Sequence, residues 1–536
     1  MNNLLLPALI FLPIITGFLC WLIEKVDERF PRWVAFFGML ATFLVTVGLW
    51  HTGDFIGSAD KAIAFGQTPT WLAEFRLPWI EALGISFHLA LDGLSLLMVS
   101  LTAFLGMMAV ACSWNEIGHR VGFFHLNLLW SLGGVIGVFL AIDMFLFFFF
   151  WEMMLIPIYF LIAIWGHNSG GKTKEYAATK FFIYTQASGL VMLIGILILV
   201  IMHQLQTGQV SFNYMDLLGT DLGKWQYPVM LMFFIGFAVK LPIFPLHGWL
   251  PDAHAQAPTA GSVDLAGILI KTAAYGLLRF VLPMFPEASH EFAPIAIALG
   301  GIGIFYGAWL AFVQTDIKRL LAYTSISHMG FVVLALYAGT LMSLQGLMIQ
   351  MLAHGLSSAA LFIMSGQLYE RLHTRDMSVM GGMWGQMRYY PPLLMFFSAA
   401  LMGIPGTGNF IGEFLILMGS FKTNPMAVVL ATFSLVWAGL YALIMIYRTL
   451  FGETTETIHK IAPMKNMTAR EAMILLTLAF GLLWLGLYPQ SFLDTSDHSM
   501  RWIADAYQQV VPTVVDMPAV SQAPVSDEPF AHLEAK

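Results

Sequence analysis

The chain has 536 residues, of which 58% are hydrophobic and only 11% are charged, and its formal net charge at pH 7 is −7. Ordinary soluble domains carry about 25% charged residues, so this composition excludes a soluble globular protein. Apolar runs such as residues 145–164 reach the roughly 20 residues that an α-helix needs to cross a bilayer. Long runs of this kind, rather than short alternating segments, predict a polytopic all-α membrane protein and not a β-barrel.

The first apolar run lacks a positively charged leader and a small-residue cleavage site. We therefore expect a retained first span rather than a signal peptide. The two cysteines, Cys20 and Cys112, lie in or at the end of apolar runs, and there is no CxxC motif or Cys/His cluster. We expect neither a disulfide nor a zinc or iron–sulfur site.

Apolar runs alternate with polar breaks along the chain and predict about fourteen spans. The stretch 122–166 is too long for one span, and its only plausible break is Ile142–Asp143. Asp143 and Asp92 lie near span ends, where we expect them to cap helices. The predicted spans are 3–23, 33–50, 88–112, 122–141, 143–166, 176–203, 227–246, 260–282, 293–313, 319–338, 342–369, 391–420, 425–450 and 469–488.

The lysines and arginines between the spans are unevenly distributed. Loops after odd-numbered spans carry sixteen of them and loops after even-numbered spans carry four. The positive-inside rule then places both termini on the outer side, which is the periplasm for a bacterial inner membrane. The polar segment after Phe492 predicts a surface helix near Trp502–Val511, followed by a frayed tail rich in Pro, Ala and Asp.

Two predicted spans that lie five apart, the seventh and the twelfth, are interrupted by proline and glycine. Pro242 is expected to leave the carbonyl of Ala238 unpaired, because proline lacks an N–H. Such breaks at matching places point to two inverted repeats around a transport site, although proline kinks are also common in membrane helices. The residues that carry the two breaks are Pro242, Pro245, Pro405, Gly406 and Gly408. The predicted divisions are 1–121 (spans 1–3), 122–283 (first five-helix repeat), 284–452 (second five-helix repeat), 453–489 (loop and span 14) and 490–536 (polar tail).

Six ionisable residues lie well inside separate spans: Glu152, Lys240, Lys271, His328, His354 and Glu413. A charge at the bilayer centre costs roughly 2.5–3.5 kcal/mol even on lenient scales, so these side chains should face one another along an interior axis. Each one alone could be structural, as a snorkelling lysine, a satisfied core histidine or a paired glutamate. Together they are two carboxylates, two amines and two imidazoles. Burial destabilises the charged forms of the first two types, and imidazole already titrates near neutral pH, so the set favours stepwise proton transfer.

Two polar stripes accompany this row. Gln350, His354 and Ser358 recur at helical spacing, as do Thr324 and His328. Such stripes either line a file of water or bind a neighbouring helix, and we favour water.

Other polar residues point to no further site. His247, Asp252 and His254 lie close together, but their spacing matches no metal-ligand motif, so we expect no metal. Glycine clusters at 133–137 and 300–307 fit close helix packing better than nucleotide binding, because no strand precedes them. No Walker, haem-attachment or dinucleotide motif occurs. We expect no cofactor in this chain, so the energy for transport must come from another subunit or from an ion gradient.

Long stretches of the sequence resemble the antiporter-like subunits of respiratory complex I, and above all the M-type subunit of bacterial NADH:quinone oxidoreductase. The similarity covers nearly the whole chain. It is carried by FFFWEMMLIPIYFLIAIWG (148–166), FAVKLPIFPLHGWLPDAHAQAPTAGSVDLAGILIKTAAYGLLR (237–279), TDIKRLLAYTSISHMG (315–330), MLAHGLSSAALF (351–362) and GIPGTGNFIGEF (403–414).

The resemblance implies fourteen helices, two inverted five-helix repeats and broken seventh and twelfth helices. It implies that Glu152 and Lys240 form the ion pair of a proton-uptake half-channel. Lys271, His328 and His354 would then form a central relay, and Glu413 the terminal proton site on the outer side. It also implies that FMN, iron–sulfur clusters and quinone are bound by other subunits, and that the partners are lipids and neighbouring membrane-arm subunits, with no nucleic acid.

Two other interpretations stay open. The chain could be a subunit of an Mrp-type cation/proton antiporter, which shares this fold and the Glu/Lys pair. It could also be a passive membrane module whose charges only hold helices together.

Overall fold

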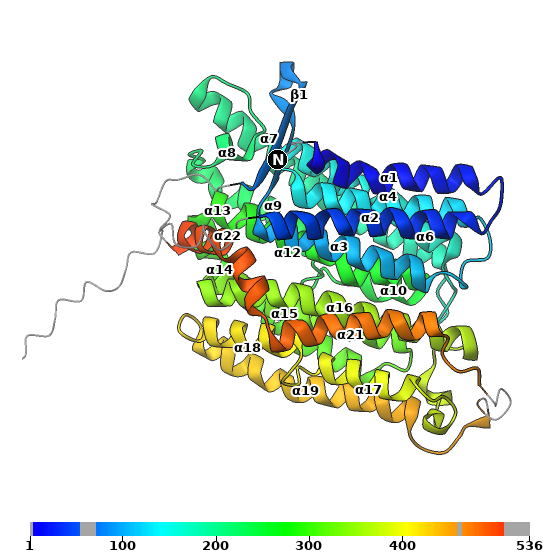
Figure 1. The fold of residues 1–536 in the computed structure, drawn as a ribbon. Coiled ribbons are helices and arrows are strands. Elements are labelled where there is room, and N and C mark those ends of the chain that lie inside the picture. The colour runs from blue at the N-terminus through cyan, green and yellow to red at the C-terminus, as the bar shows by residue number, and fades with distance from the viewer. Residues whose placement is uncertain (1–3, 54–70, 457, 459–463, 509–536) are drawn as a thin grey trace, which may run out of the picture.

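The computed structural model describes residues 4–53, 71–456, 458 and 464–508. In this part of the chain the helices lie side by side as one bundle (Figure 1), and twelve of them are long and apolar enough to cross a membrane. The prediction of a polytopic all-α protein is confirmed, whereas the count of fourteen spans stays a prediction. The candidate spans are Leu5–Ile23, Phe30–Thr52, Gly93–Cys112, Val121–Leu140, Met144–Trp165, Lys174–Thr207, Thr259–Met284, Pro286–Val313, Ile317–Ala338, Leu341–Leu372, Pro425–Leu450 and Ala469–Leu487.

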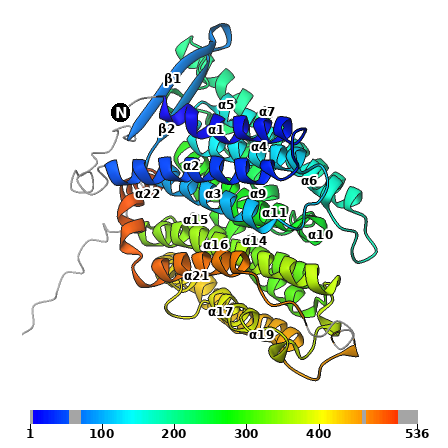
Figure 2. The same ribbon diagram turned by 45° about the vertical axis from the view of Figure 1, so that its right-hand side comes forward.

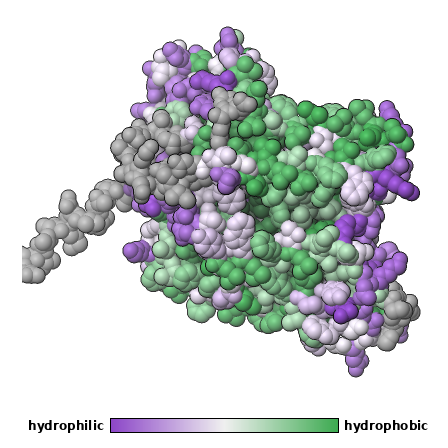
Figure 3. Space-filling model, in the orientation of Figure 1, coloured by the Kyte–Doolittle hydropathy of each residue, from purple (hydrophilic) through white to green (hydrophobic). Residues whose placement is uncertain are grey.

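Apolar side chains cover the middle of the visible face of the bundle, and hydrophilic ones gather toward its two ends (Figure 3). This distribution is the one expected for a protein whose sides face lipid. The helices are α1 (Leu5–Ile23), α2 (Phe30–Thr52), α3 (Gly93–Cys112), α4 (Val121–Leu140), α5 (Met144–Met153), α6 (Leu155–Trp165), α7 (Lys174–Thr207), α8 (Tyr214–Leu217), α9 (Gln226–Lys240), α10 (Leu250–Gln256), α11 (Thr259–Asp264), α12 (Ile270–Gly276), α13 (Leu282–Met284), α14 (Pro286–Val313), α15 (Ile317–Ala338), α16 (Leu341–Leu372), α17 (Tyr390–Leu401), α18 (Gly408–Phe421), α19 (Pro425–Leu450), α21 (Ala469–Leu487) and α22 (Gln490–Gln508).

The long stretch 122–166 breaks where the sequence predicts. Helix α4 ends at Leu140 and α5 begins at Met144. Asp143 caps α5, since its carboxylate accepts hydrogen bonds from the backbone N–H groups of Phe145 and Leu146. Asp92 caps α3 in the same way, through a capping box with Ser95. The predicted capping role of both aspartates is confirmed.

The third span begins later than predicted because residues 85–91 form a strand. Strands β1 (Ala73–Ile80) and β2 (Ile85–Leu91) pair antiparallel as a hairpin. The carbonyl of His88 also accepts a hydrogen bond from the N–H of Ile142, in the linker between α4 and α5. These pairings satisfy the backbone of 85–91 as a strand, so the span predicted at 88–112 begins at Gly93 instead.

The predicted seventh span ends early, because α9 stops at Lys240 and the chain becomes helical again only at Leu250. The prediction of an unpaired carbonyl at Ala238 is wrong: the chain turns after Pro242, and the N–H of Ile243 reaches this oxygen at 2.9 Å. The carbonyl of Val239 is satisfied by the indole N–H of Trp249 at 2.7 Å. The break between α17 and α18 has the same pattern, with the N–H of Ile404 bonded to the carbonyl of Ala399 at 3.2 Å.

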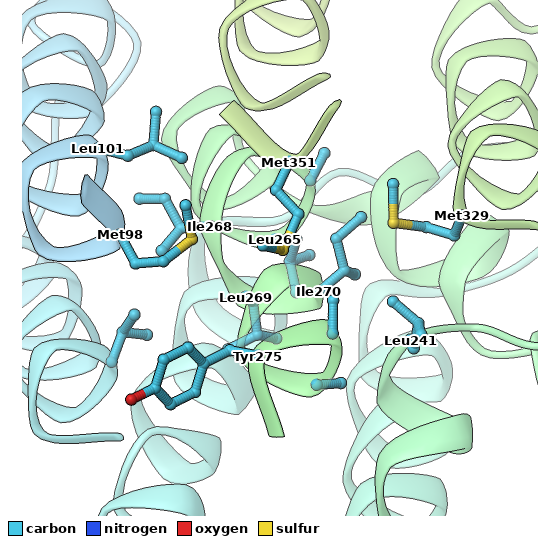
Figure 4. Packing of buried hydrophobic residues seen from close by; sticks show 14 of the residues in the cluster. Met98, Leu101, Leu241, Leu265, Ile268, Leu269, Ile270, Tyr275, Met329 and Met351 are labelled. Atoms are coloured by element: carbon cyan, nitrogen blue, oxygen red, sulfur yellow. The ribbon is translucent and has the colours of Figure 1, made fainter. Parts of the chain in front are cut away.

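The span predicted at 260–282 occupies the centre of the bundle and is fully buried. It is built from α11, a π-helical turn η3 (Leu265–Leu269), α12, a second π-helical turn η4 (Leu277–Val281) and α13. Figure 4 shows Leu265 and Ile268 of this helix packed between Met98 of α3 and Met351 of α16. This helix is therefore the one that the others surround.

The N-terminal end of α1 and the C-terminal helix α22 lie at the same end of the bundle (Figures 1 and 2). Helix α22 begins earlier than the predicted stretch near Trp502–Val511, directly after Pro489. It crosses the beginning of α3 so closely that a Cβ on Gly93 would lie 1.6 Å from the carbonyl oxygen of Thr495. The predicted frayed tail, from residue 509 on, lies outside the described residues.

Candidate functional site

Five of the six ionisable residues that the sequence places inside spans are buried, and Glu152 is partly buried. Lys240, Lys271 and His354 have no exposed surface. His328 and Glu413 are 3% and 4% exposed. Since charged side chains are seldom left alone at such depth, the partners of each one decide what the set can do.

Two glycines bring the first pair of this set together. Gly267, in the π-helical turn η3, faces Gly355 in α16, and a Cβ on Gly355 would lie 2.9 Å from the carbonyl oxygen of Gly267. Because the two helices approach this closely, Lys271 Nζ lies 2.7 Å from His354 Nδ1. The Lys271 ammonium also donates to the carbonyl oxygen of Ala266, inside η3. A lysine and an imidazole thus share a hydrogen bond at the centre of the bundle.

The row continues from His354 to the next two residues. The rings of His354 and His328 have centroids 5.5 Å apart. His328 Nδ1 lies 3.0 Å from Glu413 Oε1, although without the alignment of a hydrogen bond. Gln350 donates to the same carboxylate oxygen at 3.3 Å. Lys271, His354, His328 and Glu413 therefore form one row of neighbouring titratable groups.

The break before α18 positions Glu413. A Cβ on Gly412 would lie 2.6 Å from the side-chain oxygen of Gln350, so the glycine allows α18 to pack tightly on α16. Gly403 has a positive φ of 70°, and a Cβ there would lie 2.7 Å from Glu413 Oε2. Glycine is needed at both positions for this carboxylate to reach His328.

Lys240 and Glu152 are arranged differently from what the resemblance implies. Lys240 Nζ has no hydrogen-bond partner and lies 3.5 Å from the centroid of the Trp151 ring. Glu152 faces α7 instead, where a Cβ on Gly189 would lie 2.0 Å from its Oε1 atom. Among the described residues, no ion pair joins Glu152 to Lys240. The structure thus brings four of the six predicted residues together, and Lys240 and Glu152 lie outside that row without a direct ion pair.

The five predicted break residues lie at the ends of interrupted helices. Pro242 and Pro245 lie between α9 and α10, and Pro405 and Gly406 lie between α17 and α18. Gly408 is the first residue of α18. A Cβ on Gly408 would lie 2.7 Å from Cβ of Leu485, so this position favours a residue without a side chain.

The polar stripes bond mainly within the protein. The hydroxyl of Ser358 donates to the carbonyl of His354 at 2.5 Å, and that of Thr324 donates to the carbonyl of Leu321 at 2.8 Å. Gln350 donates to Glu413 on a neighbouring helix. That these stripes also line a file of water stays a prediction.

A charged cluster lies at the end of the bundle opposite to α22. The carboxylate of Asp252 accepts hydrogen bonds from Lys172, Lys180 and Arg319 at 2.8–2.9 Å. Burial alone would raise the pKa of Asp252, but these three cations hold it below its ordinary value. His254, nearby in the sequence, stacks on Phe362 with ring centroids 4.5 Å apart. The described residues contain no group of three His, Cys, Asp or Glu side chains arranged to hold a metal ion.

The sequence analysis missed several buried ionisable residues, among them Asp264 and Lys318. Asp264 has no exposed surface; Ser131 donates to its Oδ2 at 2.8 Å and its Oδ1 has no partner. It lies inside the apolar run 260–282, so the criterion that found Lys271 could have found it. Lys318 lies between the predicted spans 293–313 and 319–338, yet it is 2% exposed and donates to the carbonyl of Ala257 at 2.9 Å.

The chain matches proteins of known family over most of its length. A family model described as "NADH:quinone oxidoreductase/Mrp antiporter, TM" matches residues 141–438. The NADH-quinone oxidoreductase subunit M of Pseudomonas aeruginosa is 60% identical over 503 residues, which cover 93% of this chain and 97% of that relative. The fold is also that of a chain in respiratory complex I from Thermus thermophilus with bound NADH. The TM-score is 0.83 at 28% identity, covering 94% of this chain and 99% of the other.

A chain of the Mrp complex from Dietzia sp. DQ12-45-1b has the same fold, with a TM-score of 0.78 over 95% of this chain and 98% of the other. At 19% identity this likeness shows the fold alone. The Pseudomonas protein is far more similar, at 60% identity, and the match covers nearly all of both chains. This similarity decides between the NADH-quinone oxidoreductase branch and the Mrp branch of the family. The chain belongs to the antiporter-like membrane family of NADH:quinone oxidoreductases and Mrp antiporters, and within it to the M subunits of NADH-quinone oxidoreductase.

Proposed function

We propose that this chain is the proton-translocating M subunit in the membrane arm of a bacterial NADH:quinone oxidoreductase. Quinone reduction in other subunits, which hold FMN and the iron–sulfur clusters, drives it. The observation that carries the proposal is the buried line Lys271–His354–His328–Glu413, with contacts of 2.7 Å at one end and 3.0 Å at the other. Amine, imidazole and carboxylate each gain and lose a proton, so each group of this line can accept a proton and pass it on. The step between the rings of His354 and His328, whose centroids are 5.5 Å apart, requires water or a side-chain movement.

In the proposed path, Lys240 and Glu152 take up the proton from the inner side and Glu413 releases it toward the outer side. The side-chain rotation needed between His328 and Glu413 is small, because their atoms are already 3.0 Å apart. No hydrogen bond joins Lys240 to Lys271, so this step requires water or movement.

We also propose that residues 122–283 and 284–452 are inverted repeats and that both termini face the periplasm across the inner membrane. The matching hydrogen bonds at the two helix breaks, Ile243 to Ala238 and Ile404 to Ala399, support the repeats. The excess of lysine and arginine in loops after odd-numbered spans supports the orientation.

The decisive experiment replaces Glu413 by Gln in the assembled complex. The amide keeps the size of the side chain but cannot exchange a proton, so we expect NADH-driven proton pumping to fall at least tenfold while the complex still assembles. Assembly is measured as NADH oxidation with an artificial electron acceptor. Glu291→Gln, the same change at an exposed position of α14, is the matched control.

Full proton pumping by both variants would contradict the proposal and favour a passive structural role for this chain. Purification of the chain in a complex without flavin and iron–sulfur subunits, with cation/proton exchange in vesicles, would instead assign it to an Mrp-type antiporter.

A further inference from the structure

The ammonium group of Lys240 lies against an aromatic surface, not against a carboxylate. Its Nζ atom is 3.5 Å from the centroid of the Trp151 ring and has no hydrogen-bond partner. Both side chains have no exposed surface. A cation placed on the face of an indole is stabilised by the ring quadrupole, weakly at exposed sites and more strongly where water is excluded.

The ring of Trp151 is held in this orientation by two phenyl rings. Phe147, one turn earlier on α5, stacks on it with centroids 5.8 Å apart, and Phe237 of α9 meets it edge-on at 5.3 Å. Phe237 lies one turn before Lys240 on the same helix, so the two side chains share a face. Phe237 in turn packs on Gly276, where a Cβ would lie 2.2 Å from the ring. The indole face is therefore a preformed position for the ammonium.

Glu152 follows Trp151 directly on α5 and turns about 100° further round the helix axis. Its Oε1 atom faces Gly189 of α7 and has no hydrogen-bond partner. The carboxylate thus adjoins Trp151, the residue that contacts Lys240, but is directed to another helix. One residue of α5 offers the ammonium an aromatic face, and the next offers it a countercharge.

We propose that the Lys240 ammonium has two alternative positions, the face of Trp151 and the carboxylate of Glu152, and that Trp151 is the positioning residue that sets the balance between them. This inference rests on the proposed proton-transfer function. On Trp151, the lysine keeps its proton after Glu152 has been neutralised or has moved away. A weaker aromatic partner leaves the ammonium either held by Glu152 or prone to lose its proton early.

Among the described residues of the helices packed on α9, no other charged group competes for Lys240. The titratable side chains of α7, α12, η4 and α14 that face the interior have partners elsewhere: Lys180 bonds Asp252, His203 bonds Thr220, Lys271 bonds His354, Arg279 bonds Asp92 and His290 bonds the carbonyl of Tyr507. Glu152, the neighbour of Trp151 on α5, is the remaining carboxylate that can serve as a partner.

The test replaces Trp151 in the assembled complex by mono-, di- and trifluorinated tryptophan. Fluorine withdraws charge from the ring face but barely changes its size, so packing is kept while the attraction for a cation falls stepwise. We expect coupled proton pumping to fall in the same order. The alkaline limb of its pH profile should move to lower pH by about one pH unit at full fluorination, because the lysine loses its proton earlier.

The matched control is the same series at Trp165, a buried tryptophan that packs against Phe123 and Phe124 and donates to the carbonyl of His119. No effect is expected there. Trp151→Phe should give an intermediate pH profile and Trp151→Leu the most shifted one.

Two results are decisive in different ways. If Lys240→Met keeps full proton-coupled turnover, the proposed function fails and this inference with it. If Lys240→Met abolishes pumping while the fluorinated Trp151 series leaves the rate and pH profile unchanged, the proposed function stands and the role of Trp151 is overturned.

Discussion

Asp264 illustrates at the scale of a residue how a buried polar group can be maintained in an apolar helix. Its carboxyl group is fully buried, accepts one hydrogen bond from Ser131 and faces no cation among the described residues. A buried charge without a counterion is far more costly than a neutral group with one hydrogen bond. The site therefore favours a protonated carboxyl that links α4 to the central helix.

This assignment predicts the effect of Asp264→Asn. An amide is neutral and similar in shape, so we expect the free energy of unfolding to change by less than about 0.5 kcal/mol. Asp264→Leu should cost about 1–3 kcal/mol, because the hydroxyl of Ser131 is then left unpaired. Thermal denaturation of the purified complex measures both. A loss of several kcal/mol for the asparagine variant would mean that the carboxyl is ionised.

At the scale of an element, the crossing of α16 with the central helix decides the position of the relay. Gly267 and Gly355 remove the side chains that would keep these helices apart, and the contact between Lys271 and His354 follows from that approach. The interaction is thus a consequence of helix packing as well as of the two residues themselves.

Gly355→Ala tests this dependence. The new Cβ would lie 2.9 Å from a backbone oxygen that cannot move alone. We expect a cost of about 1–3 kcal/mol from overpacking, together with lower proton pumping as Lys271 and His354 separate. Gly301→Ala in α14, which has open space around its Cβ, is the matched control and should be neutral or slightly stabilising. Unchanged pumping in Gly355→Ala would show that the contact tolerates the separation.

The cluster around Asp252 joins α10 to α7 and α15 by charge. Its cations lower the pKa of the Asp252 carboxyl, and a group with a lowered folded pKa stabilises the protein above its unfolded pKa. Asp252→Asn should therefore cost about 2 kcal/mol at pH 7. The difference from the parent should shrink as the pH falls below about 4 and through the lowered folded value. Melting curves of both proteins from pH 3 to pH 7 check the sign; a difference that grows toward acid would contradict it.

At the scale of the whole molecule, a buried ion pair attaches the C-terminal helix to the bundle. Arg279 of η4 donates to the carboxylate of Asp92 at the start of α3, and the hydroxyl of Ser499 in α22 donates to the same carboxylate at 2.7 Å. Three segments far apart in the chain thus meet at one carboxylate.

Removing one partner of this pair should be costly. Arg279→Met leaves Asp92 buried without its cation, for an expected loss of about 3–5 kcal/mol, whereas Asp92→Leu combined with Arg279→Met should cost clearly less than the sum of the single changes. The melting temperatures of the four proteins in this cycle measure the coupling. Strictly additive losses would show that the pair contributes no coupling energy.

The predictions from sequence were most accurate where a feature is local. Span positions, the break at Ile142–Asp143 and the capping by Asp92 and Asp143 depend on runs of residues and on nearest neighbours. The hairpin 73–91 was not predicted, because the apolar residues of β2 look like the start of a membrane span. Only the pairing of β2 with β1 and with the 141–143 linker makes it a strand.

The sequence by itself determined that this is a membrane helix bundle with titratable residues inside its spans, because apolar run length and the cost of burying charge are properties of the residues alone. It also identified the six residues of the row. Only the tertiary structure decided which of them meet. Glycine-mediated helix approaches bring Lys271, His354, His328 and Glu413 into line, and packing places Lys240 on the ring of Trp151 without a direct ion pair to Glu152. Side-chain direction and helix crossing are set by packing between distant segments, and spacing along the chain does not contain them.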